Sequence, residues 1–194
     1  RKKQDPLRFE HDEFVKPTTT PEVLAKLRPA FRKEGGTVTA GNASGLNDGA
    51  AALLMANEQG MGQHGLEPLA RMVSSAVVGV PPRIMGIGPV EASKKALAKA
   101  GLGWDDVDVI ELNEAFAAQS LACIRSWNLP DDDPRINPNG GAIALGHPLG
   151  MTGARILLSA ARQLRRTGGK HALVTLCIGV GQGYAAVIQN TSSS

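Results

Sequence analysis

Cysteine is the residue type whose scarcity says most about this chain. Two cysteines, Cys123 and Cys177, occur among 194 residues, 54 positions apart and without a Cys-x-x-Cys pair. This excludes a disulfide framework and a cysteine-ligated zinc site, and no His-Glu-x-x-His pattern is present. We therefore expect a reducing, cytoplasmic compartment and no metal.

Aromatic residues and long apolar runs are also rare. Aromatics make up 4% of the chain, which indicates a core of Ala, Val, Leu and Ile. The longest apolar run, residues 172–180, is too short to cross a bilayer. The charged start, residues 1–5, is followed by no apolar stretch, so neither a signal peptide nor a membrane partner is expected. The first residue is arginine rather than methionine, and we expect the natural product to extend upstream.

Neither sign of charge dominates the chain. The sequence has 21 Lys and Arg against 18 Asp and Glu, a net charge of +3. The basic clusters at residues 1–3 and 162–166 are interpreted as solvated faces. Because no zinc-finger, RNP or basic-helix pattern accompanies them, no nucleic-acid partner is expected.

What the chain does have is a regular succession of elements. Residues 1–45 are polar and turn-rich, with one short helix expected over 21–27 after the N-cap Thr20. The run 47–58 predicts a buried helix, because it is apolar nearly all round. Strands and helices then alternate, which predicts an α/β fold with helices covering a mixed sheet. The expected strands are 69–80, 107–112, 170–178 and 184–189, the last two antiparallel, and the expected helices are 89–100, 116–127 and 151–166.

Cys177 ends an apolar strand and opens a glycine turn, residues 179–183. Glycines at 179 and 181 permit a sharp bend immediately after the thiol. A cysteine beside exposed N–H groups can have a lowered pKa and act as acid, base or nucleophile, although a cysteine in an apolar strand is more often part of the core. The turn favours the chemical role, whereas Cys123 lies on the apolar face of a helix and is expected to be structural.

His147 lies between Gly146 and Pro148 in a glycine-rich loop. Proline holds the residue before it in extended geometry, so the imidazole has a fixed, non-helical backbone. A helix beginning near Gly150 would direct its first N–H groups toward this loop, which favours an oxyanion or thiolate there. His147 is therefore a candidate catalytic residue.

Asn113 marks the switch from an expected strand to an expected helix. Helix capping explains an asparagine at this place. The carboxyl end of a strand is also where α/β folds collect catalytic groups, and the amide could position a water or donate to an oxyanion. Both interpretations stay open.

Two nucleotide-binding motifs are excluded. The Gly-Val-Gly-Gln-Gly turn at 179–183 is followed by an expected strand rather than a helix, so it is no Rossmann site. The chain has no Gly-x-x-x-x-Gly-Lys-Ser/Thr loop either.

Four segments together resemble the thiolases, the enzymes that cleave or form 3-oxoacyl-CoA. They are Gly-Asn-Ala-Ser-Gly-Leu-Asn-Asp-Gly-Ala at 41–50, Asn-Glu-Ala-Phe at 113–116, Gly-His-Pro-Leu-Gly at 146–150 and Cys-Ile-Gly at 177–179. The resemblance runs from near residue 1 to about 189. It implies helices layered on a mixed five-stranded sheet, the second half of a duplicated fold. The expected divisions are 1–46, the end of a CoA-binding loop region; 47–66, the last helix of the first half; 67–190, the C-terminal domain; and 191–194, a tail.

The resemblance also implies roles for four catalytic residues. His147 would activate a nucleophilic cysteine and help to hold the thioester oxygen. Cys177 would move a proton to and from the α-carbon of acetyl-CoA. Asn113 would hold a water that completes an oxyanion hole with the histidine, and the backbone N–H of Gly179 would belong to a second oxyanion hole.

Coenzyme A or acetyl-CoA is the implied substrate rather than a resident cofactor. Ser44 matches a residue that touches the pantetheine arm, with Ala40 and Phe31 as neighbours. Lys16 matches a basic residue near the CoA nucleotide.

The acylated cysteine of thiolases is missing. In the family it lies in the first of two similar halves, and residues 1–60 contain no cysteine. We therefore expect the isolated chain to be inactive, its partner to be an N-terminal thiolase half, and the complete protein to be a homodimer or homotetramer. The apolar run 50–56 should be exposed without that half and cause self-association.

The turn at 177–183 carries valine at 180 where many relatives have glycine. This variant resembles thiolases of aromatic-acid breakdown and implies 3-oxoadipyl-CoA as the substrate. Two alternatives remain: a protein that binds acyl-CoA without turnover, and an assembly half that pairs with a separate chain.

Overall fold

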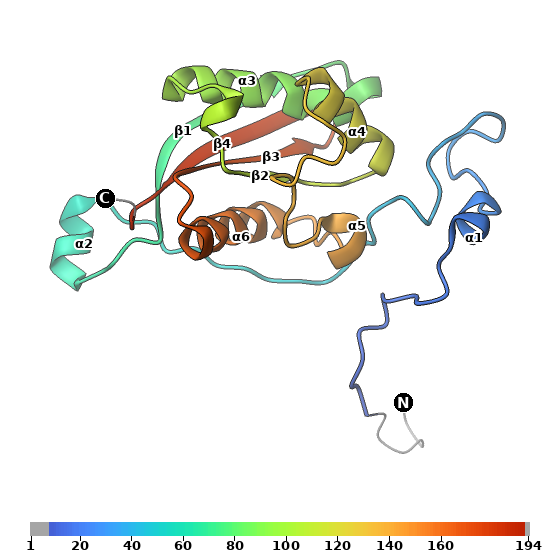
Figure 1. The fold of residues 1–194 in the computed structure, drawn as a ribbon, viewed down its shortest axis with the longest axis horizontal. Helices are drawn as coiled ribbons and strands as arrows, with labels where there is room; N and C mark the ends of the chain where they lie inside the picture. Colours follow the sequence, from blue (N-terminus) through green and yellow to red (C-terminus); the bar gives the residue numbers. More distant parts are fainter. Residues whose placement is uncertain (1–7, 193–194) are drawn as a thin grey trace.

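The structure, a computed structural model, describes residues 8–192. At its centre lies a mixed sheet of four strands in the order β1-β4-β3-β2 (Figure 1). β3 pairs parallel with β2 and antiparallel with β4, and β4 pairs antiparallel with β1. The expected α/β class and its four strands are confirmed. The strands are β1 (Ala70–Gly79), β2 (Val109–Leu112), β3 (His171–Ile178) and β4 (Gln182–Asn190).

Helices cover both faces of this sheet. α3 (Gly88–Ala100) and α4 (Ala117–Ser126) lie on one face, and α6 (Thr152–Thr167) lies on the other (Figure 1). α6 buries an apolar stripe and exposes its arginines Arg162, Arg165 and Arg166. The three long helices expected from the sequence are thus confirmed. The shorter helices are α5 (Ala142–Leu145), η1 (Pro82–Ile87) and η2 (Trp104–Asp106).

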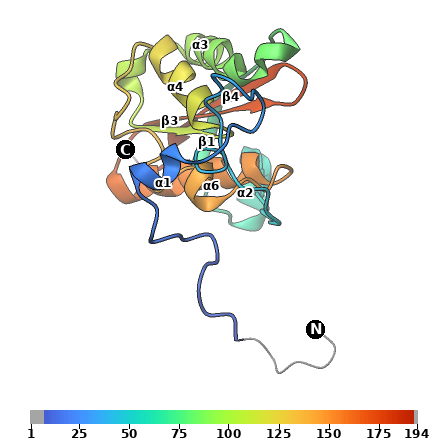
Figure 2. The same ribbon diagram turned by 90° about the vertical axis from the view of Figure 1, so that its right-hand side faces the viewer.

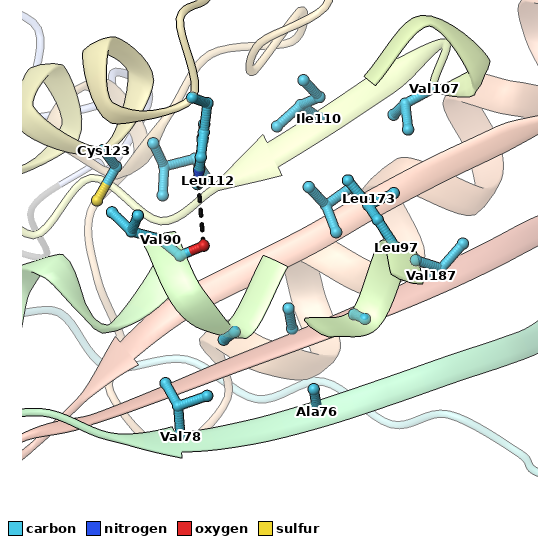
Figure 3. Close-up of a cluster of buried hydrophobic side chains, with 14 of the residues drawn as sticks. Ala76, Val78, Val90, Leu97, Val107, Ile110, Leu112, Cys123, Leu173 and Val187 are labelled. Carbon is cyan, nitrogen blue, oxygen red and sulfur yellow. Dashed lines mark hydrogen bonds between the residues drawn. The ribbon is translucent and has the colours of Figure 1, made fainter. Parts of the chain in front are cut away.

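Two apolar clusters hold the helices to the sheet. The larger one lies between the sheet and α3 and α4, and Figure 3 shows some of its side chains, among them Leu97, Leu173 and Val187. The indole Nε1 of Trp127 donates to the Val90 carbonyl at 3.5 Å. The smaller cluster lies under α6. Its members are Val109, Ile156, Ala160, Ala161, Leu164, Ala172, Val174 and Ile188.

A fifth strand is not formed, so the strand count implied by the resemblance is wrong for the described residues. The place beside β2 is taken by residues 135–137, which make a single parallel bridge between Ile136 and Ile110. Asn137 has a φ of +46°, outside the strand region. Its side chain then replaces the backbone as the partner of Leu112, accepting from its N–H and donating to its carbonyl at 2.9 Å each. The ladder therefore stops after one bridge.

Residues 8–65 have a different character from the sheet region. They contain α1 (Pro21–Ala25), capped by Thr20 as expected, and α2 (Glu58–His64). None of these residues is buried. The segment runs as extended chain beside the α/β layers and away from them toward the N-terminus (Figures 1 and 2).

The buried helix expected over 47–58 is wrong. Residues 48–57 have no regular structure, and helix begins only at Glu58. Because an alanine-rich helix without polar residues needs apolar neighbours on several sides, it has nothing to pack against here. The exposure expected for the run 50–56 holds for Leu54 and Met55, whereas Leu53 is half-buried.

No helix within residues 8–192 combines the length and apolar character needed to cross a bilayer.

Candidate active site

Asn113 and His147 meet beyond the carboxyl end of β2. Asn113 follows β2 directly, and its backbone N–H donates to the Thr175 carbonyl on β3 at 3.0 Å. The residue is 1% exposed. Its side-chain Nδ2 lies 3.3 Å from Nε2 of His147. The fold thus brings together two of the four residues expected to be catalytic.

Asn113 does not cap the following helix, so the capping interpretation is wrong. α4 begins at Ala117, and its N-cap position is Phe116. Residues 113–116 instead cross toward the N-terminal segment, where Phe116 forms a bridge with Ala43 and the Ala117 N–H donates to the Asn42 carbonyl at 2.9 Å. The amide of Asn113 is therefore directed to the histidine rather than to a helix end.

The backbone of His147 is held by the N-terminal segment. Its N–H donates to the Gly45 carbonyl at 2.8 Å, and it forms a parallel bridge with Leu46. Gly146 before it has a φ of +86°, and a Cβ at Gly146 would overlap the side chain of Asn47. Glycine is therefore required for the histidine loop to approach this segment.

The hydrogen bonds around the imidazole define its tautomer. Nδ1 of His147 lies 2.7 Å from Oγ1 of Thr152, and that hydroxyl donates its own proton to the Pro148 carbonyl at 3.0 Å. Since the hydroxyl proton is already used, Nδ1 must carry the proton and donate to Thr152. Nε2 is then unprotonated and accepts from the Asn113 amide. Burial lowers the pKa of His147, and the positive charge of Arg155 lowers it further, which keeps the ring neutral near pH 7.

The helix end near the histidine differs from expectation. α6 begins at Thr152 rather than near Gly150. The N–H groups of Met151 and Thr152 both donate to the Pro148 carbonyl, at 2.9 and 3.0 Å. These groups therefore stabilise the histidine loop itself.

Cys177 lies near the end of β3 and is buried. Burial raises the pKa of its thiol above the ordinary value, and a backbone hydrogen bond opposes this only in part. The lowered pKa considered from the sequence is wrong for this environment. A thiol that keeps its proton at neutral pH is suited to donate a proton rather than to attack as a thiolate.

Cys123 was expected to be structural, and Gly179 was expected to contribute to an oxyanion hole. Cys123 on α4 is fully buried, and burial raises the pKa of its thiol to about 11. Its Sγ donates to the Gly86 carbonyl at 3.4 Å, which agrees with a structural role. Gly179 is exposed in the turn between β3 and β4. Within residues 8–192 no hydrogen bond joins His147 to Cys177.

Comparison with known protein families decides the assignment. The thiolase C-terminal domain family matches residues 66–190, and the thiolase N-terminal domain family matches residues 1–59. The chain belongs to the thiolase family.

Individual thiolases are similar over almost the whole chain. The 3-oxoadipyl-CoA/3-oxo-5,6-dehydrosuberyl-CoA thiolase of Escherichia coli K12 is 58% identical over 93% of this chain and 45% of that protein. The beta-ketoadipyl-CoA thiolase of Pseudomonas aeruginosa is also 58% identical, over 93% and 45%. The crystal structure of human mitochondrial 3-ketoacyl-CoA thiolase in complex with CoA has a TM-score of 0.88 at 54% identity, covering 94% of this chain and 46% of that one. This thiolase chain spans less than half the length of these relatives.

The residues expected to bind CoA differ in their surroundings in this thiolase chain. Ser44 is half-buried, and its hydroxyl donates to the Ala115 carbonyl at 3.2 Å, next to Asn113. Phe31 packs edge-on against Phe116 with ring centroids 5.8 Å apart, while Ala40 is exposed. Lys16 is exposed on the extended segment before α1. Ser44 and Phe31 thus border the strand-to-helix crossing.

Three further residues of the site escaped the sequence reasoning. Thr152 orients the imidazole from five residues away. Glu114 organises the loop before α5 by accepting from the Ile143 N–H at 3.1 Å and from the Asn137 amide at 3.2 Å. Glu111 on β2 is 3% exposed, its Oε1 has no hydrogen-bond partner in the described part of the chain, and burial raises its pKa to about 7. The sequence does place Glu111 as a charged residue inside an apolar strand, and this could have indicated a buried carboxyl group.

No group of three or more metal-ligating His, Cys, Asp or Glu side chains occurs between residues 8 and 192.

Proposed function

We propose that this chain forms the proton-transfer half of a thiolase that cleaves 3-oxoacyl-CoA with CoA, or runs the reverse condensation. The observation that carries the proposal is the position of His147, with Nδ1 in contact with the Thr152 hydroxyl and Nε2 facing the Asn113 amide. An unprotonated Nε2 is a general base, and an amide donor beside it is what an oxyanion needs.

The proposed chemistry divides between two proton carriers. His147 takes the proton of a nucleophilic cysteine, whose thiolate adds to the 3-oxo carbon. The bond between the α- and β-carbons then breaks, and the thiol of Cys177 gives its proton to the α-carbon of the departing acetyl-CoA. CoA thiol finally displaces the acyl group from the cysteine. The raised pKa of Cys177 supports its assignment as the acid.

Asn113 and Gly179 are assigned to the two developing oxyanions. The Oδ1 of Asn113 is buried and has no protein partner within the described residues. A buried acceptor of this kind costs about 1–3 kcal/mol unless it is hydrogen-bonded. This supports the proposal that Asn113 holds a water beside the imidazole, while the N–H of Gly179 serves the second hole.

The nucleophile belongs to an N-terminal thiolase half, which we propose as the partner of this chain, in the same polypeptide or as a separate one. The exposed apolar side chains of residues 46–55 support this assignment, because they are the surface such a half would cover. They include Leu46, Leu54 and Met55. A homodimer or homotetramer is the expected state of the complete protein, and its cytoplasmic location stays a prediction.

The proposed substrate is 3-oxoadipyl-CoA. The names of two similar thiolases, from Escherichia coli and Pseudomonas aeruginosa, support it. The CoA complex of the human structural relative supports CoA as the common part of the substrate.

A thiolysis assay tests the function. The 194-residue chain is measured alone and joined to the N-terminal half of a beta-ketoadipyl-CoA thiolase, with acetoacetyl-CoA and 3-oxoadipyl-CoA as substrates. We expect no turnover by the chain alone and turnover by the joined protein. His147→Ala in the joined protein should reduce kcat by about 10²- to 10⁴-fold, the usual contribution of a general base. Turnover by the chain alone would contradict the divided site, and binding of acyl-CoA without turnover by the joined protein would favour the non-catalytic alternative.

A further inference from the structure

Val180 has a backbone conformation that its side chain makes costly. Its φ is +58°, in the left-handed region where a side chain costs roughly 1–2 kcal/mol and a β-branched residue is a genuine outlier. The other two non-glycine residues with positive φ in the described chain are Asn128 and Asn137. Asparagine tolerates this region, whereas valine does not.

The turn that contains Val180 packs closely against the segment before η1. The Gly181 carbonyl accepts from the Val80 N–H at 2.8 Å. A Cβ at Gly181 would overlap the Val80 carbonyl and lie 3.1 Å from the Cα of Pro82. The segment before η1 thus clamps the turn from one side. Strain that the surroundings impose in this way is typical of functional sites.

Val180 contributes little packing in return for this strain. Its side chain is 80% exposed, so it fills no part of the core of this chain. It follows Gly179, whose N–H is assigned above to an oxyanion hole, and it lies three residues after Cys177. The residue directly after the proposed oxyanion donor therefore presents its side chain to the outside of this chain.

The segment that packs against the turn also carries an arginine. Arg83 follows Pro82, the residue that packs against Gly181, and is exposed. Among residues 8–192, Arg125 and Arg135 form ion pairs with Asp131 and Asp133, and no ion pair involves Arg83. The turn therefore carries an exposed aliphatic side chain, and the segment that packs against it carries an exposed arginine without an acidic partner in the described chain.

We propose that Val180 and Arg83 determine acyl specificity, selecting 3-oxoacyl-CoA substrates whose acyl chain ends in a carboxylate. Val180 contacts the methylene groups, and Arg83 binds the terminal carboxylate, to which its planar fork is matched. The inference rests on the proposed thiolase function and adds the residues that read the far end of the substrate.

The test compares two substrates of equal length that differ in the terminal charge, 3-oxoadipyl-CoA and 3-oxohexanoyl-CoA, on the joined protein. Arg83→Met should lower kcat/KM for 3-oxoadipyl-CoA at least about tenfold, the size of a partly desolvated charge pair, and change kcat/KM for 3-oxohexanoyl-CoA less than about twofold. Arg83→Lys should retain part of the preference. Val180→Gly should reduce the discrimination between the two substrates and raise Tm, because it removes the strain. Arg162 is an exposed arginine on α6, and Arg162→Met is the matched control. It should change kcat/KM for neither substrate.

Equal effects of Arg83→Met on both substrates, or no effect, would overturn the inference. If the joined protein cleaves neither substrate, the proposed function fails. Binding of the unreactive analogues adipyl-CoA and hexanoyl-CoA, measured by calorimetry, then decides the inference separately. A preference for adipyl-CoA that Arg83→Met abolishes supports it, and equal affinity for the two analogues refutes it.

Discussion

The sheet region, residues 70–190, and the N-terminal segment, residues 8–65, differ in how their conformation is maintained. The sheet region has two apolar clusters and four strands joined by backbone hydrogen bonds. The N-terminal segment buries no residue. It is attached near the site by isolated bridges at Ala43 and Leu46 and by the hydrogen bond from Ser44.

This difference shows that the site depends on both regions for different reasons. The sheet region supplies Asn113, His147 and Cys177 together with the core that holds them. The N-terminal segment supplies backbone contacts to the loops that carry Asn113 and His147, and its own order depends on those loops. Damage to the sheet region should therefore act on folding, and damage to the segment should act on the site.

The largest effect should follow from removing a core side chain. Leu173→Ala, at a fully buried position of the larger cluster (Figure 3), should lower the free energy of unfolding by about 3 kcal/mol, because it leaves a cavity in the core. Leu54→Ala, at a position 80% exposed in the N-terminal segment, should change it by less than about 0.5 kcal/mol. Urea denaturation of both variants checks this, and equal losses would show that the segment has a core contribution of its own.

The second effect is a pH dependence of the free energy of unfolding that arises from the sheet region. Burial raises the pKa of Glu111 from 4.5 to about 7. The folded state is therefore not penalised below pH 4.5 and loses stability as pH rises through 7, because the carboxylate must then ionise while buried. Glu111→Gln should remove this loss and raise the free energy of unfolding at pH 8 by on the order of 2 kcal/mol. Denaturation at pH 5 and pH 8 measures it. Glu34→Gln, an exposed acid of the segment, is the control and should show no such difference.

A smaller effect, on kcat, should show whether the Thr152 hydroxyl orients the His147 ring without changing the fold. Thr152→Val removes the hydroxyl that fixes the His147 tautomer and keeps the side-chain shape, whereas Thr152→Ser keeps the hydroxyl. The valine variant should lose about tenfold in kcat of the joined protein, the cost of one buried hydrogen bond to the general base, and the serine variant should stay near the original rate. Nitrogen chemical shifts of the ring should show Nδ1 protonated in the original and serine proteins and a tautomer mixture in the valine protein. An unchanged tautomer in the valine variant would contradict the assignment.

The smallest effect should come from the N-terminal segment. Ser44→Ala removes the hydrogen bond to the Ala115 carbonyl, but the Ser44 backbone N–H still donates to the same oxygen at 3.1 Å. The expected result is a two- to fivefold rise in KM for the CoA substrate with kcat unchanged, about 0.5–1 kcal/mol. Thr18→Ala, farther along the segment, should leave KM unaltered. A large fall in kcat would show that the segment takes part in the chemistry.

The strands and long helices could be predicted from the sequence because their side chains alternate with the periods of strand and helix. β3 was recognisable as a continuous apolar run, and α6 from its apolar stripe and arginine face. The run at 48–56 was mispredicted because an alanine-rich apolar segment becomes helical only when neighbours cover it, and the sequence does not reveal whether they are present.

The pairing of Asn113 with His147 could be predicted only from the resemblance to thiolases and not from the residues alone. The two residues are 34 positions apart, and the contact depends on how the loop before α6 folds back over the end of β2. Thr152 and Asn137 could not be identified for a similar reason. One acts through a hydroxyl that must reach a ring five residues earlier, and the other acts through a positive φ that local preferences disfavour.

The short bridge of residues 135–137 also has a consequence for solubility. The backbone groups of β2 that face outward, at Ile110 and Leu112, are bonded to Arg135 and Asn137, so this edge of the sheet offers no free row of donors and acceptors to another molecule. Exposed edges are where sheets join to form aggregates. Backbone groups of Arg135 and Asn137 and the Asn137 side chain thus together protect β2 from edge-to-edge association, and intermolecular strand pairing, if it occurs, would have to begin at β1.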